Sequence, residues 1–306
     1  MQNKNNNFIK YSWFILAMVF LVILAGGIVR MTQSGMGCPD WPRCFGMWIP
    51  PTDASQLPAD FVKYLDKQDI DHSFNVYHTW IEYINRLLGA LLGVFIFIYF
   101  IYSLIKFRKT DKIIVFSTFA LVLVTGFQGF LGKLVVDGNL SVVKITIHML
   151  VALIIAAIPL YVISRTKGNR IMIPQSLKTI SIVSFIAVII QIIFGTQVRE
   201  LIDEISKGLA YQQRELWISG AMGTVYYIHR SFSWIILGLT SYLWWKSQDF
   251  PELKRNVNLI SGSVIIAIAA GLTMNFFDIP ALAQPIHLFI ACALSMSLFY
   301  YIIRTK

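Results

Sequence analysis

The sequence predicts an all-α integral membrane protein with eight transmembrane helices, arranged as two four-helix bundles that are parallel repeats of each other. The prediction rests on composition, on eight apolar stretches and on an internal repeat. Of the 306 residues, 56% are hydrophobic and only 14% are charged, whereas a soluble domain carries about 25% charged residues. This composition excludes a soluble enzyme and a disordered chain, and three cysteines are too few for a disulfide scaffold.

Eight stretches reach the length of about 20 apolar residues that a helix needs to cross a bilayer. They cover residues 11–30, 77–107, 113–136, 141–164, 179–198, 224–245, 257–277 and 284–303. The first is too long for the apolar core of a signal peptide, and no small-residue cleavage site follows it, so we expect it to be a span. Two long outer loops result, at residues 31–76 and 200–223.

The segments between the spans differ in charge. The N-terminus, residues 106–112, 165–178 and 246–256, and the C-terminus hold 15 of the 26 Lys and Arg residues but only three of the 16 acidic ones. Such segments lie in the cytoplasm, so we expect a multi-pass protein of the plasma membrane with both termini cytoplasmic. Most of the net charge of +10 then reflects the orientation of the chain in the membrane. We expect no nucleic-acid binding, because the basic residues are scattered over short loops.

Short segments recur in the two halves of the chain. The pairs are Gly-Gly-Ile-Val-Arg (26–30) with Gly-Thr-Gln-Val-Arg (195–199), Tyr-Ile-Asn-Arg (83–86) with Tyr-Ile-His-Arg (227–230), Val-Thr-Gly-Phe (124–127) with Ala-Ala-Gly-Leu (269–272), and Ile-His-Met-Leu (147–150) with Ile-His-Leu-Phe (286–289). Four spans per repeat give both halves the same orientation in the membrane. We therefore expect domains at residues 1–165 and 166–306.

Four of the five histidines, His78, His148, His229 and His287, lie in predicted spans, all near the outer surface. Ionisable groups inside spans are costly and are functional candidates. His229 and His287 hold equivalent places in the second half, where two facing imidazoles can ligate a heme iron from both sides. The alternative is a pair of core histidines bonded to backbone carbonyls. His72, in the first outer loop, is expected to be solvated.

The first half differs at one of these places. His148 matches His287, but Asn85 stands where the second half has His229. His78 precedes Asn85 by about two helical turns and so shares its face. It either replaces the missing ligand or lies at the mouth of the span as an interfacial residue.

Glu82 is a further asymmetry, because the second half has Tyr226 at the equivalent place. A carboxylate near a metal site in a low dielectric can accept a proton; the alternative is a salt bridge to Arg86 or Arg30. Four arginines recur as matched pairs near the outer span ends: Arg30, Arg86, Arg199 and Arg230. They either hold heme propionates through bidentate contacts or extend to the membrane interface.

Two cysteines lie six residues apart in the first outer loop, in Gly-Cys-Pro-Asp-Trp-Pro-Arg-Cys (37–44). Because this loop faces an oxidising compartment, Cys38 and Cys44 either form a disulfide or remain two free thiols. Cys292, in the last span, is expected to be a small core residue.

With these motifs the chain resembles the heme A synthase family, membrane oxidoreductases that convert heme O to heme A for cytochrome oxidase. The resemblance covers nearly the whole chain. The matching elements are Thr-Gln-Ser-Gly-Met-Gly-Cys-Pro-Asp-Trp-Pro-Arg-Cys (32–44), Glu-Tyr-Ile-Asn-Arg (82–86), Ile147-His148, His229-Arg230 and His287. The resemblance implies a heme b held by His229 and His287 in the C-terminal half. It implies an N-terminal half where a methyl group of heme O is oxidised to a formyl.

The resemblance also implies roles in the N-terminal half. Glu82 would serve in proton removal or substrate positioning, and Cys38 and Cys44 would form a reducible disulfide beside the substrate. The family usually has His where this chain has Asn85, so either His148 is the one protein ligand and leaves an open iron position, or His78 is the second ligand. Implied partners are the heme O substrate, a heme O synthase and an electron acceptor such as a quinone, besides the lipid bilayer; an oligomer is left open.

Two other classes of membrane protein share some of these features. A membrane cytochrome b that carries electrons without modifying heme explains the four span histidines, but not Glu82 or the loop cysteines. A transporter built from parallel repeats predicts helix breaks near the middle of the membrane, whereas the polar residues here lie at the outer end.

Overall fold

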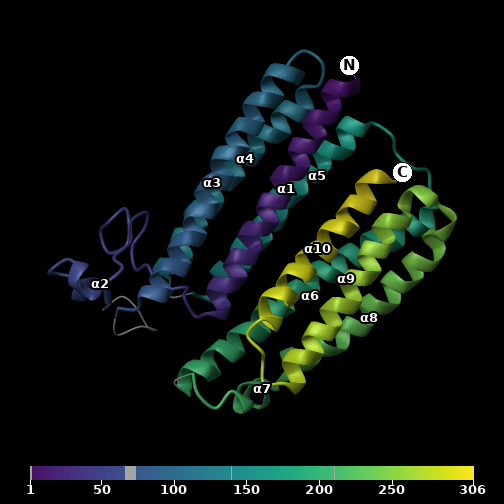
Figure 1. Cartoon of the computed structure of the whole chain (residues 1–306). Coiled ribbons are helices and arrows are strands. Elements are labelled where there is room, and N and C mark those ends of the chain that lie inside the picture. The colour runs from purple at the N-terminus through teal and green to yellow at the C-terminus, as the bar shows by residue number, and fades with distance from the viewer. Residues whose placement is uncertain (1, 66–73, 139, 210) are drawn as a thin grey trace. The chain divides into compact units, whose positions relative to one another are not determined.

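The computed structural model describes residues 2–65, 74–138, 140–209 and 211–306 (Figure 1). His72 lies outside the described residues. The described part is helical and contains no strand, only two isolated β-bridges. Its helices are α1 (Gln2–Met31), η1 (Ala54–Gln56), α2 (Val62–Leu65), α3 (Val76–Phe107), α4 (Lys112–Asp137), α5 (Val142–Lys167), α6 (Gln175–Gly208), α7 (Glu215–Ala221), α8 (Thr224–Lys246), η2 (Ser247–Asp249), α9 (Pro251–Phe276) and α10 (Ala283–Arg304).

Seven described helices are long and apolar enough to cross a membrane: α1, α3, α4, α5, α6, α9 and α10. The protein is therefore an all-α multi-pass membrane protein, as its composition predicted. Helix α8 covers the expected span at 224–245 but falls outside this set. His229, Arg230 and several Ser, Tyr and Trp residues interrupt its apolar run.

The chain divides into two compact units, Met1–Pro159 and Leu160–Lys306. In the first unit α3 packs against both α1 and α4. Near the start of α1, the Phe8 ring stacks on the Tyr99 ring of α3 with centroids 5.0 Å apart. Ser12 and Tyr99 share a hydrogen bond of 2.6 Å below this contact. A small-residue and aromatic face thus joins α1 to α3.

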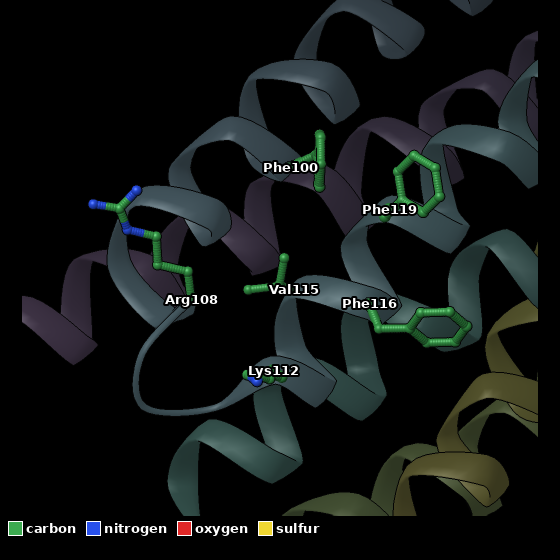
Figure 2. Close-up of a pocket in the computed structure, with 6 residues that line it drawn as sticks. All are labelled: Phe100, Arg108, Lys112, Val115, Phe116 and Phe119. Atoms are coloured by element: carbon green, nitrogen blue, oxygen red, sulfur yellow. The ribbon is translucent and has the colours of Figure 1, made fainter.

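A cavity of about 390 Å³ lies at the junction of α3 and α4 (Figure 2). Its lining residues are Phe100, Arg108, Lys112, Val115, Phe116 and Phe119. They belong to the end of α3 and the start of α4, whereas Glu82 and Asn85 belong to the first turns of α3. None of the site residues predicted from the sequence lines this cavity.

In the second unit α6, α8, α9 and α10 pack in a ring in which each helix contacts two neighbours. The short α7 packs against α6. The C-terminal residues are fixed to the first turn of α6 and to the segment before it: Ile171 and Thr305 form a β-bridge, and Lys178 Nζ of α6 donates to the Thr305 carbonyl at 2.6 Å.

Helix α6 corrects the predicted extent of the second outer loop. The apolar run ends near Val198, but the helix continues to Gly208. The added residues are mostly good helix formers, and Arg199 Nε lies 3.2 Å from Asp203 Oδ2 in an i,i+4 ion pair. Hydropathy detects only the part of a helix that lies in lipid, so a polar extension is missed.

Candidate functional site

The outer loop of the first unit is organised around a disulfide. Cys38 and Cys44 are bonded to each other, with Cα atoms 4.9 Å apart, and both are fully buried. Together with buried Phe45 they form a small core against which further side chains of the loop and of α3 pack. The described members of that shell are Met47, Leu57, Tyr64, Phe74 and Tyr83.

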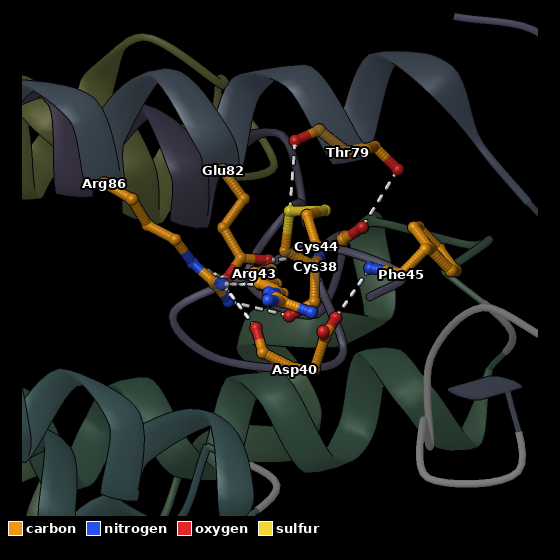
Figure 3. Close-up of polar contacts among 9 residues, drawn as sticks. Cys38, Asp40, Arg43, Cys44, Phe45, Thr79, Glu82 and Arg86 are labelled. Carbon is orange, nitrogen blue, oxygen red and sulfur yellow. Dashed lines mark hydrogen bonds and ion pairs between the residues drawn. A yellow bond between two sulfur atoms is a disulfide. The ribbon is translucent and has the colours of Figure 1, made fainter. Parts of the chain in front are cut away.

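Glu82 connects this loop to α3 (Figure 3). Its side chain is buried, and Oε2 accepts the Cys38 backbone N–H at 2.7 Å. Its Oε1 pairs with the Arg86 guanidinium, one turn further along the helix. Of the two roles weighed for Glu82, a salt bridge to Arg86 is formed in the structure.

Arg86 uses all its donors within this cluster. A guanidinium has five N–H groups. Two of them, on Nε and Nη2, donate to Glu82. The second N–H of Nη2 donates to the Cys38 carbonyl at 2.7 Å. Nη1 donates to the carbonyls of Asp40 at 2.5 Å and Arg43 at 3.1 Å. In this conformation the donors of Arg86 are directed to Glu82 and to loop carbonyls, and a contact with a heme propionate stays a prediction.

The loop is held at two further places. Asp40 accepts the N–H groups of Phe45 at 2.6 Å and Gly46 at 2.9 Å, which closes the turn that contains the disulfide. Thr79 Oγ1 donates to the Gly37 carbonyl at 2.9 Å. Gly37 approaches α3 so closely that a Cβ there would lie 2.3 Å from the His78 carbonyl oxygen. The sequence therefore needs glycine at this position for the loop to lie on the helix.

The second unit brings His229 of α8 and His287 of α10 together. Their ring centroids are 6.3 Å apart and the rings are inclined by 71°. A metal–imidazole bond of about 2 Å on each side, plus about 1 Å from nitrogen to ring centre, places two opposed ligands about 6 Å apart. The observed separation would therefore suit one metal held between the two imidazoles.

The hydrogen bonds of this pair also suit metal ligation. His287 Nδ1 lies 2.9 Å from the Ala267 carbonyl; because a carbonyl only accepts, the proton is on Nδ1 and Nε2 keeps its lone pair. His229 Nδ1 is buried with no hydrogen-bond partner. No group of three His, Cys, Asp or Glu residues that could hold a metal occurs in the described part of the chain.

Glycines face both rings. A Cβ on Gly195 of α6 would lie 3.1 Å from His229 Cε1, and one on Gly271 of α9 would lie 3.6 Å from His287 Cε1. The absence of a side chain on the neighbouring helix gives each imidazole the room to lie flat beside it. This clearance is a second feature that fits a heme b at this place.

His148 of α5 has similar surroundings but no ring partner. A Cβ on Gly132 of α4 would lie 3.6 Å from His148 Cε1, and Gln128 Nε2 donates to the His148 backbone carbonyl at 2.9 Å. His148 Nδ1 is buried without a hydrogen-bond partner. Among the residues that the structure describes, no imidazole makes a ring contact with His148 like the edge contact of His287 with His229.

His78 and Asn85 both lie in the first turns of α3. The buried Oδ1 of Asn85 has no hydrogen-bond partner, which is a polar group that a ligand would satisfy. His78 is half-buried. Both candidates for the place opposite His148 therefore remain predictions.

The other expected site residues are distributed over four helices. Arg30 is half-buried in the last turn of α1. Arg199 pairs with Asp203 on α6, and Arg230 is exposed on α8. Cys292 is a buried free thiol in α10, the place expected of a core residue.

Two glutamines were missed by reading the sequence. Gln191 Nε2 of α6 donates to the His229 carbonyl at 2.7 Å, as Gln128 does to that of His148. A lone polar amide in an apolar run is a signal that could have identified both. The structure also places Gly132, rather than Gly126, in the position beside a histidine that Gly271 holds.

Comparison with known proteins gives one family. The family described as "Cytochrome oxidase assembly protein" matches residues 10–299. A protein of Flavobacterium johnsoniae named heme A synthase is 25% identical, with 99% of each chain covered. Heme A synthases of Flavobacterium psychrophilum (26% identical, 88% of this chain and 89% of the relative) and Wolbachia pipientis (27%, 95% and 91%) are similar too.

Proposed function

The chain belongs to the cytochrome oxidase assembly protein family, and from that premise we propose that it is a heme A synthase. Its substrate would be heme O and its product heme A, formed by oxidation of a porphyrin methyl group to a formyl. Relatives of that name align with almost the full length of the chain, and this observation carries the proposal. An electron acceptor such as a quinone and a heme O synthase would be its partners.

The C-terminal half, residues 166–306, would hold heme b. His229 and His287 supply two imidazoles whose ring centroids lie 6.3 Å apart, and Arg199 of α6 and Arg230 of α8 are the proposed partners of the propionates. Bound there, heme b would supply electron transfer. The protein's own contribution is to hold two neutral rings in place through Gln191, Gly195 and the Ala267 carbonyl.

The N-terminal half, residues 1–165, would bind heme O. His148 is the proposed iron ligand, and Asn85 in place of a second histidine would leave an open position opposite it, which suits oxidation chemistry because a bis-His iron has no free site. Arg30 is the proposed propionate partner. Glu82 would act by positioning, since both its oxygens are engaged by Arg86 and the Cys38 N–H.

We propose eight crossings of the plasma membrane, with both termini in the cytoplasm. Helix α8 has 23 residues, or about 34 Å at 1.5 Å per residue, which exceeds the bilayer core of about 30 Å. It packs between α6 and α9, two helices that are apolar enough to cross. Of its polar residues, Tyr226 and Thr240 are buried within the unit.

The test is mass analysis of hemes extracted from cells that make the protein together with a heme O source. We expect heme A or its hydroxylated intermediate from the wild type and neither from His148→Ala. Asn85→His would fill the open position and should lower the yield of product, and wild-type product in this variant would reject the open position. A loss of heme content in His78→Ala would instead identify His78 as the second ligand, and wild-type heme content and product there would reject that role. Heme b alone in the wild type and in His148→Ala would favour an electron-carrying cytochrome b.

A further inference from the structure

The disulfide of the outer loop is enclosed by the protein. Cys38 and Cys44 each have no exposed surface, and Phe45 is almost fully buried beside them. Thiol–disulfide exchange and phosphine reduction both need a reagent to reach a sulfur atom. The bond can therefore react only when the segment that carries it lifts from α3.

The contacts that keep this segment on α3 converge on one ion pair. Glu82 accepts the Cys38 N–H, and Arg86 donates to the carbonyls of Cys38, Asp40 and Arg43 (Figure 3). Arg86 is thus bound to three carbonyls of the loop, while Glu82 neutralises its charge and fixes its orientation. Loss of either side chain removes bonds to the segment and leaves the other charge buried without a counter-ion.

Trp80 and Tyr83 of α3 donate to the carbonyls of Pro51 and Trp48, further along the loop. Nearest to the disulfide, the loop has one more side-chain bond to α3, from Thr79 to the Gly37 carbonyl. It is a neutral bond, and charge-assisted bonds are roughly twice as strong as neutral ones. The ion pair therefore holds this segment on α3 more strongly than the Thr79 bond does. A variant of Thr79 serves as the comparison for variants of the ion pair.

We infer that Glu82 and Arg86 form a latch that controls chemical access to the Cys38–Cys44 disulfide. In this inference Glu82 is a positioning residue that acts through the loop and not a group that takes a proton from the substrate. The latch follows from the contacts alone. Its importance for catalysis rests on the proposed function, in which the reducible disulfide lies beside heme O.

The latch is tested by the rate at which tris(carboxyethyl)phosphine reduces the disulfide in the purified full-length protein. The phosphorus attacks one sulfur and releases the other as a thiolate; hydrolysis then gives the phosphine oxide and the second thiol, so two electrons pass to the disulfide. Quenched samples are denatured, labelled with a maleimide and weighed. The oxidised chain takes one label, on Cys292, and the reduced chain takes three.

We expect Glu82→Gln and Arg86→Gln each to speed reduction at least tenfold, and the double variant to react no faster than the quicker single one, because the two residues act as a unit. Thr79→Val should speed it only a few-fold. Asp203→Asn is the matched control, because it breaks another Arg–acid i,i+4 pair on α6; its rate should equal that of the wild type. Circular dichroism verifies that each variant is folded.

Wild-type rates in Glu82→Gln and Arg86→Gln, or an effect of Thr79→Val as large as theirs, would overturn the latch. If Glu82→Gln does not accumulate, Glu82→Asp keeps the charge but shortens the reach to Cys38, and it should change the rate in the same direction. Heme analysis separates the two proposals. A chain that shows the latch but makes no heme A refutes only the function, and heme A production with unchanged rates refutes only the latch.

Discussion

Glycines determine where the histidine rings of this protein can lie. Three of the four span histidines face a glycine on a neighbouring helix, namely Gly132, Gly195 and Gly271. The clearances differ: a Cβ on Gly195 would lie 3.1 Å from His229, which is too close, whereas one on Gly271 would lie 3.6 Å from His287, an ordinary contact. Alanine at Gly195 and at Gly271 should therefore disturb the proposed heme b site to different degrees.

Gly195→Ala should displace the His229 ring by a few tenths of an ångström and alter ligation of the heme. We expect a several-fold loss of bound heme b or a shift in its electron paramagnetic resonance signal. Gly271→Ala, with its ordinary contact, should be close to the wild type in both measurements. Equal behaviour of the two variants would show that these clearances do not govern the histidines.

Gly37 is the residue on which the docking of the outer loop depends. An alanine Cβ would lie 2.3 Å from the His78 carbonyl, and a helix backbone cannot yield as a side chain can. Gly37→Ala should therefore lower the stability of the first unit by about 1–3 kcal/mol, the usual cost of overpacking. Thermal unfolding in detergent measures it.

Gly35→Ala is the control for this change in the same loop. Its Cβ would meet side chains and no backbone: Leu140 at 3.3 Å, which can rotate away, and Val29 at 4.0 Å. A fall in the unfolding midpoint as large in Gly35→Ala as in Gly37→Ala would mean that the close approach to α3 is not what matters.

The types of the site residues could be predicted from the sequence, but not all of their partners. The ring centroids of His229 and His287 lie 6.3 Å apart, and the cysteines form a disulfide, one of the two states that the sequence left open. The repeat pairs Arg86 with Arg230 and so predicts the same role for both. In the structure, however, Arg86 donates to backbone carbonyls of the outer loop. Those partners lie more than 40 residues away, and backbone carbonyls leave no mark in a sequence.

At the scale of the helix, the outer end of α3 depends on its cap. Asn75 accepts the N–H groups of Tyr77 and His78 through Oδ1, at 3.0 and 3.3 Å. Asn75→Ala should cost about 1 kcal/mol, the usual loss for a cap, and Asn75→Ser should retain most of the stability. Urea unfolding of the purified protein measures both; no difference between them would mean that the cap contributes nothing here.

The two units use equivalent helix ends differently. In α3 the place holds Glu82 and binds a disulfide loop; in α8 it holds Tyr226, which hydrogen-bonds to Asn275 and packs with Val198, Trp217 and Ile218. The exchange of an acid for a tyrosine was visible in the sequence. Its consequence was not, because the extension of α6 and the short α7 that build the apolar cluster lie outside the apolar runs.

For the whole molecule, α8 decides the topology, because without its crossing the two termini would lie on opposite sides of the membrane. It is long enough to cross and packs between two apolar helices. We therefore predict that Asn6→Cys, Asp249→Cys and Lys306→Cys, each in a Cys292→Ser background, react with an impermeant maleimide only after the cells are permeabilised. Gln212→Cys, in the segment before α7, should react on intact cells.

Each alternative topology predicts a different labelling pattern at these four positions. Asn6, Asp249, Lys306 and Gln212 are exposed on the protein surface, so a cysteine that fails to react is shielded by the membrane and not by the fold. Labelling of Asp249→Cys on intact cells would mean that α8 does not cross. Labelling of Lys306→Cys but not Asn6→Cys would give an odd number of crossings, and His229 and His287 would then no longer belong to two equivalent outer helix ends.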